Sequence, residues 1–154
     1  INRNDVMTLI QMRPEGEPIQ WLAFASNAFN VLAPFYTDMD TTPGYLSGTN
    51  GKVSTENFYW MSRMIAAMAD ASYSKSIFHI ERYQERVMSK GHEYINQYDE
   101  LLSKESDAEK RMQLRQEANE KIADMVKKET QDTLNKVLYE LSNQMKNAYS
   151  RSDA

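Results

Sequence analysis

Glycine and proline are concentrated in one third of this sequence. The chain of 154 residues holds five glycines and four prolines, and only Gly91 lies beyond residue 51. Both residue types interrupt helices, proline because it lacks an amide hydrogen and glycine because ordering its backbone costs more entropy. The distribution therefore predicts strands and turns in the first third and helices in most of the rest.

Three short apolar runs predict strands over residues 6–12, 19–25 and 29–36. Pro34 removes a ladder hydrogen bond, so the third strand is expected to end at an edge of the sheet or just outside it. Three strands with apolar residues on both faces make a poor sheet by themselves. This pattern is typical of strands that continue a larger sheet.

The whole chain then divides into three regions. Residues 1–36 are strands that complete a central sheet, 37–54 a long polar loop, and 55–154 a helical region with three helices. A polar connection as long as the one over 37–54 is either functional or mobile. The predicted fold class is α+β, with a partial antiparallel sheet followed by a long helical region.

The three helices are predicted to run from Ser54 or Thr55 to about Tyr73, from about Ile77 to Ser103, and from Ser106 to as far as Tyr149. The first is apolar around most of its circumference, which predicts burial between the sheet and outer helices. Gly91 lies on the apolar face of the second, where it would let a neighbouring helix approach closely. Ser106 and Glu109 have the spacing of a capping box at the start of the third. The last two helices are expected to form an antiparallel hairpin.

Composition excludes several classes of function. The net charge is -4, and no dense basic stretch is present, which argues against a nucleic-acid partner. No apolar run has the roughly 18 to 20 residues needed to cross a membrane, so no membrane association is expected. The chain has no cysteine and no metal-binding or cofactor motif, so we expect no metal and no cofactor. Since the first residue is Ile1 and not Met, we expect a part of a longer protein.

Four stretches together resemble a known family. Residues 1–14, 20–25 (QWLAFA), 33–36 (APFY) and 54–60 (STENFYW) are similar to the C-terminal part of the dipeptidase A-type cysteine dipeptidases. The similarity extends from residue 1 to about residue 103. It implies an N-terminal-nucleophile hydrolase, whose αββα fold packs antiparallel sheets between helical layers.

The resemblance also implies a mechanism and its partners. In that family a cysteine at the mature N-terminus attacks the peptide carbonyl, its own α-amino group acts as the base, and hydrogen-bond donors stabilise the oxyanion. The chain would then be a C-terminal segment that is inactive alone, because the cysteine is absent. Its partners would be the remainder of the parent polypeptide and a short peptide substrate. We further expect a cytoplasmic homo-oligomer.

Four residues are candidates for substrate binding in the whole enzyme. Ser26 and Asn27 follow a predicted strand directly, and an Asn27 amide there would donate to a substrate carbonyl or oxyanion; the alternative is that Asn27 only turns the chain. Arg3 and Arg13 would pair with the carboxylate of a dipeptide, or else form structural ion pairs. The competing interpretation of the whole chain is a non-enzymatic module whose helical hairpin binds a protein partner, and exposed, uninterrupted apolar faces would favour it.

Overall fold

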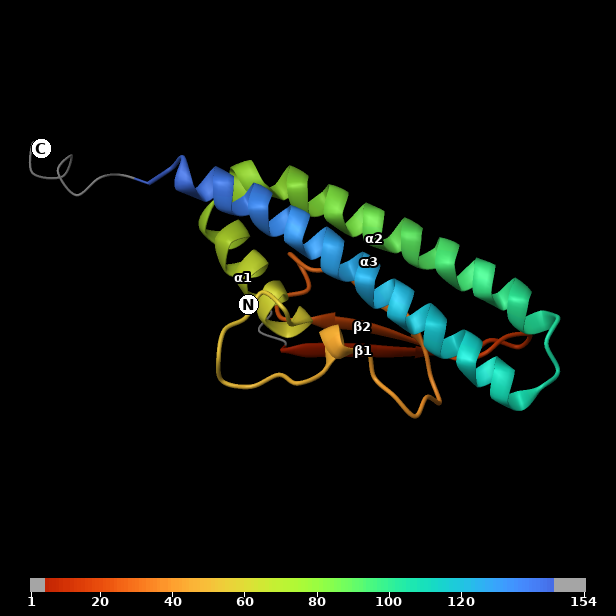
Figure 1. The fold of residues 1–154 in the computed structure, drawn as a ribbon. Coiled ribbons are helices and arrows are strands. Elements are labelled where there is room, and N and C mark those ends of the chain that lie inside the picture. Colours follow the sequence, from red (N-terminus) through yellow and green to blue (C-terminus); the bar gives the residue numbers. More distant parts are fainter. Residues whose placement is uncertain (1–4, 146–154) are drawn as a thin grey trace, which may run out of the picture.

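The computed structural model describes residues 5–145 and shows a small sheet beneath a long helical hairpin (Figure 1). The strands are β1 (Val6–Gln11), β2 (Ile19–Phe24) and β3 (Ala33–Tyr36), followed by a 3-10 turn η1 (Gly44–Leu46) and the helices α1 (Phe58–Ala71), α2 (Tyr73–Ser103) and α3 (Ala108–Ser142). The α+β class predicted from the sequence is confirmed.

The three strands form one antiparallel sheet in the order β1-β2-β3. In its register, Leu9 lies beside Trp21 and Trp21 beside Pro34. Among residues 5–145, β3 pairs with no strand besides β2, so Pro34 lies in an edge strand, as predicted. The antiparallel hairpin of α2 and α3 is also confirmed, and it lies along the sheet (Figure 1).

The two faces of the sheet have different surroundings. On one face the Trp21 ring contacts His92 of α2, with ring centroids 5.1 Å apart, and the Tyr36 hydroxyl donates to the Ile95 carbonyl over 3.1 Å. Side chains alternate along a strand, so Leu22 and Phe35 point to the opposite face. That face is covered in part by the connection after β3, and it contains the cavity described below.

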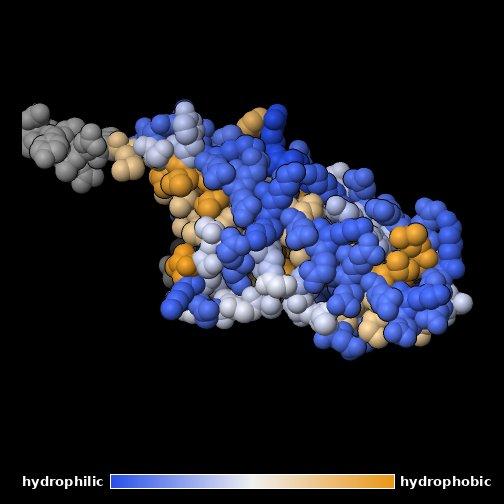
Figure 2. Space-filling model, viewed as in Figure 1, coloured by the Kyte–Doolittle hydropathy of each residue, from blue (hydrophilic) through white to orange (hydrophobic). Residues whose placement is uncertain are grey.

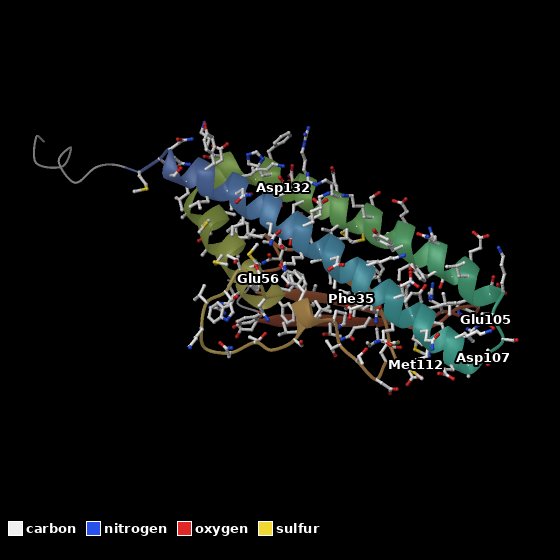
Figure 3. The ribbon with its side chains drawn as sticks, viewed as in Figure 1. Phe35, Glu56, Glu105, Asp107, Met112 and Asp132 are labelled. Atoms are coloured by element: carbon white, nitrogen blue, oxygen red, sulfur yellow. The ribbon has the colours of Figure 1, made fainter. Side chains whose placement is uncertain are left out.

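Two helices begin at different residues from those predicted, because other side chains satisfy their free amides. The Asn57 side chain accepts from the amides of Tyr59 and Trp60 (3.1 and 3.3 Å), so α1 begins after Asn57. The prediction of a capping box at Ser106 is wrong. The Asp107 side chain accepts from the Lys110 amide over 2.9 Å, and α3 begins after Asp107 (Figure 3).

The other helix limits also differ. The second helix begins at Tyr73, earlier than predicted, directly after a break in the helix at Ser72. The third ends at Ser142, and the remainder of its predicted range beyond residue 145 lies outside the described residues.

The predicted position of the first helix is wrong. Helix α1 packs against α3 and α2 at one end of the sheet, and does not lie between the sheet and the hairpin (Figure 1). One stripe holding Phe58, Met61 and Ile65 is fully buried, while Arg63 and Asp70 are exposed. The other apolar residues of α1 are small or remain partly accessible, so one buried stripe suffices to hold the helix.

The close approach expected at Gly91 is present, but the neighbour is a strand and not a helix. A Cβ atom added at Gly91 would lie 2.8 Å from both Cγ and Cδ of Pro34 in β3. Real side chains do not approach this closely, and a proline ring has little freedom to move. Gly91 therefore lets α2 rest directly on the edge strand.

We expect Gly91→Ala to destabilise the chain. Alanine favours a helix over glycine by about 1 kcal/mol, but the overlap with Pro34 costs about 1 to 3 kcal/mol, so a net loss of up to about 2 kcal/mol is predicted. Urea unfolding of the 154-residue chain measures it. Ser89→Ala, at an exposed position of α2, is the matched control and should not destabilise. In a Pro34→Ala background, Gly91→Ala should lose most of its cost; an unchanged cost would rule out the contact as its cause.

Candidate functional site

Arg13 lies in the turn between β1 and β2 and is fully engaged within the chain. Its guanidinium donates to both carboxylate oxygens of Asp99 in α2 (2.5 and 2.9 Å), and its Nε donates to the Glu17 carbonyl over 2.7 Å. The hydrogen bond to Asp99 raises the pKa of Arg13. The Tyr36 hydroxyl donates to the same carboxylate over 2.9 Å, and burial raises the pKa of that hydroxyl.

These contacts tie the β1–β2 turn to α2. They are the structural ion pair that the sequence left open as an alternative for Arg13. A role of Arg13 in binding a substrate carboxylate stays a prediction.

Ser26 and Asn27 form the turn that follows β2. The turn begins at Ala25, which has a φ of 59°. The Ser26 carbonyl accepts from the Phe29 amide over 3.1 Å and from Asn30 Nδ2 over 3.0 Å. Asn27 Nδ2 donates to Met7 Sδ over 3.2 Å. Asn27 thus closes the turn onto β1, and its role as an oxyanion donor stays a prediction.

The candidate substrate-binding residues that the structure describes do not lie together in one site. Arg13 follows β1 and Asn27 follows β2, and these strands are antiparallel. The six residues of β2 therefore separate the two side chains, at about 3.3 Å per residue. Arg3 lies outside the described residues. Arg13 and Asn27 therefore do not contact one dipeptide within this chain.

A cavity of about 350 Å³ lies on the sheet face opposite α2, at the connection after β3. Leu22 of β2, Phe35 of β3 and Leu46 of η1 give it apolar walls. Its polar lining comes from Gln20 of β2, from Asn119 of α3, and from Thr37, Asp38, Thr41 and Thr42 in the connection after β3. The cavity is formed by residues far apart in the sequence.

Asp38 lies at this cavity in an uncommon backbone conformation. Its φ is 59°, in the left-handed region that Asp tolerates better than most residues. The sequence did not identify Asp38 as a site residue. The signal that could have pointed to it is the long polar loop over 37–54, for which a function was one of two interpretations.

Residues 5–145 contain no group of three or more His, Asp or Glu side chains positioned to hold a metal ion. Over the same residues, none of the helices combines the length and the apolar character needed to span a membrane.

Comparison with known proteins identifies the family. The model of Peptidase family C69 matches residues 1–86 of the chain, which is more than half of it. The chain belongs to Peptidase family C69. The resemblance to the dipeptidase A family that the sequence indicated is thereby confirmed.

Curated relatives extend the similarity over nearly the whole chain. A probable dipeptidase A of Streptococcus pyogenes serotype M3 (strain SSI-1) is 40% identical over 159 residues, covering 99% of this chain and 33% of the relative. A dipeptidase of Bifidobacterium longum (strain NCC 2705) is 33% identical, covering 99% of this chain and 36% of the relative. The dipeptidase A of Lactobacillus helveticus is 28% identical, covering 91% and 30%. The chain thus spans about a third of the length of these relatives.

Proposed function

We propose that this chain is the C-terminal part of a cysteine dipeptidase that hydrolyses short peptides. The observation that carries the proposal is the match to Peptidase family C69, together with relatives named dipeptidase of which the chain covers about a third. The remainder of the parent polypeptide would supply the nucleophile. This chain would supply part of the sheet and part of the substrate cleft.

The chemistry of the nucleophile accounts for the proposed inactivity of the chain alone. Attack on a peptide carbonyl by sulfur requires a thiolate. The 154 residues contain no cysteine, and their ten methionines carry thioethers, which have no ionisable proton. The isolated chain should therefore bind peptides at most and leave them intact.

The outer strand of the sheet supports the proposed contact with the rest of the parent. Among the described residues, β1 pairs only with β2, so one of its backbone edges carries unpaired amide and carbonyl groups. Val6 and Ile10, on the face opposite the hairpin, are 53% and 57% exposed. An apolar strand open at its edge and on its face is a template for further pairing. We propose that strands of the parent polypeptide cover it.

The experiment compares three proteins on leucyl-leucine. The purified 154-residue chain is expected to give no hydrolysis, and the longer parent protein to cleave the peptide. A Cys→Ala change at the mature N-terminal residue of the parent should abolish that activity. Turnover by the 154-residue chain, or full activity of the Cys→Ala parent, contradicts the proposal.

The alternative of a non-enzymatic interaction module has less support. It requires an uninterrupted apolar face on the hairpin. On the face of the molecule that Figure 2 shows, the hydrophobic groups are separate, toward the two ends, with hydrophilic surface between them. Phe78 of α2 is 52% exposed, but the Arg82 guanidinium lies 4.2 Å from its ring centroid. Leu101, also exposed, lies near the opposite end of α2.

A further inference from the structure

The cavity beside β3 has an unusual charge composition. Among the residues of the described range 5–145 that line it, Asp38 is the only charged one, and no Lys, Arg or His side chain takes part. Among residues 5–145, Asp38 forms no ion pair. By contrast, Asp99 and Glu129 are each held by neighbouring cations. The cavity therefore offers an unneutralised carboxylate to a ligand.

The remaining polar groups of the cavity can complete the binding of a hydrogen-bond donor. The hydroxyls of Thr41 and Thr42 and the side-chain amide of Gln20 both donate and accept hydrogen bonds, so the Asp38 carboxylate decides the charge that the cavity prefers. An ammonium group has three donors and no acceptor, so it can pair with that carboxylate and with the acceptors beside it. A carboxylate or phosphate would be repelled by Asp38 and would find no cation.

The apolar walls of the cavity indicate which chemical group lies next to the ammonium of the ligand. Leu22, Phe35 and Leu46 are apolar, and Phe35 is only 5% exposed. A cavity of about 350 Å³ lies within the size range of small-molecule sites. A ligand with an ammonium group beside an apolar side chain fits both features.

We propose that this cavity binds the N-terminal residue of a short peptide, with its free α-ammonium group on Asp38 and its side chain against Leu22 and Phe35. The peptide class rests on the proposed function; the charge and the apolar contact rest on the cavity itself. Recognition of the free amino end would restrict the parent enzyme to peptides whose N-terminus is unblocked.

The decisive variant is Asp38→Asn in the parent protein. Asn has nearly the same shape as Asp and also tolerates a positive φ, so the backbone of the loop should be kept. Loss of one charge-assisted hydrogen bond is expected to lower kcat/KM for leucyl-leucine by about 10- to 100-fold. Asp40→Asn is the matched control, because Asp40 is exposed in the same loop but does not line the cavity. It should stay within about two-fold of wild type.

A blocked peptide separates charge recognition from damage to the loop. N-acetyl-leucyl-leucine has no ammonium group, so the wild-type parent should prefer the free peptide by at least about 10-fold, and Asp38→Asn should remove most of that preference. An Asp38→Asn enzyme that keeps the wild-type preference overturns the proposal. So does an equal loss of activity in Asp40→Asn.

Binding to the 154-residue chain tests the cavity without catalysis. Millimolar leucyl-leucine should shift the amide NMR signals of Asp38 and Thr41, and the acetylated peptide should leave them unchanged. Equal shifts with both peptides, or none with either, would overturn the inference. If the parent does not hydrolyse peptides while these shifts occur, the proposed function fails and the ligand site stands.

Discussion

Asn119→Leu is expected to lower the free energy of unfolding of the chain by about 2 to 6 kcal/mol. Asn119 of α3 is 5% exposed, and its side chain pairs with both backbone groups of Tyr36: the Tyr36 amide donates to Oδ1 over 2.8 Å, and Nδ2 donates to the Tyr36 carbonyl over 3.0 Å. It thereby replaces a neighbouring strand at the free edge of β3. Leucine has a similar size but leaves two buried backbone groups unpaired, each at a cost of about 1 to 3 kcal/mol.

Two further variants check this cause by urea unfolding. Asn135→Leu makes the same exchange at an exposed position of α3 and should change stability by less than about 0.5 kcal/mol. Asn119→Asp should be most destabilising at neutral pH, because a charged carboxylate would face the Tyr36 carbonyl. Burial should raise the pKa of that Asp above its unfolded value, so the variant should recover relative stability as the pH falls and the carboxyl group becomes a donor. No recovery in acid would contradict the pairing with the carbonyl.

The strands could be predicted closely, whereas the contacts that hold them could not. Apolar runs bounded by turn residues locate β1 and β2 to within a residue at each end. The third strand begins at Ala33 and not near Phe29, because the Asn30 side chain donates to the carbonyls of Ser26 and Ser62 and keeps this part of the chain in a turn. No local pattern predicts that bond to Ser62. The contact of Gly91 with Pro34 likewise joins residues that come together only on folding.

In the candidate site, too, one part could be predicted from the sequence and another part could not. Antiparallel pairing of the first two strands already implies that Arg13, at their shared turn, lies far from Asn27 at the other end of the second strand. That separation could have been predicted from the sequence. The cavity at Asp38 could not, because Leu22, Phe35 and Asn119 come from different elements that only the tertiary fold brings together.

Glu129 of α3 is the most deeply buried carboxylate in an ion pair among the described residues, with a side chain only 6% exposed. Arg86 Nε and Lys90 Nζ of α2 each lie 2.6 Å from one of its oxygens. Burial raises the pKa of the Glu129 carboxyl, but hydrogen bonds from Lys90 and Arg86 and their charges outweigh it, so the pKa lies below its ordinary value. Glu129 therefore stabilises the hairpin above the pKa of an unfolded glutamate, and this contribution is lost as the pH falls through the lowered folded value.

Arg86→Met should cost about 2 to 4 kcal/mol at pH 7, because it leaves a buried carboxylate with Lys90 alone. Burial should then dominate and raise the pKa of Glu129, so the variant gains stability relative to wild type as the carboxyl is protonated. The difference between the two proteins is expected to narrow as the pH falls from about 6 to 3, where other carboxylates titrate equally in both. Asp132→Asn removes the other partner of Arg86, which is 3.3 Å away and 45% exposed, and should cost less than about 1 kcal/mol. A gap between wild type and Arg86→Met that stays constant over this pH range would show that the loss comes from packing of the arginine stem and not from the charge on Glu129.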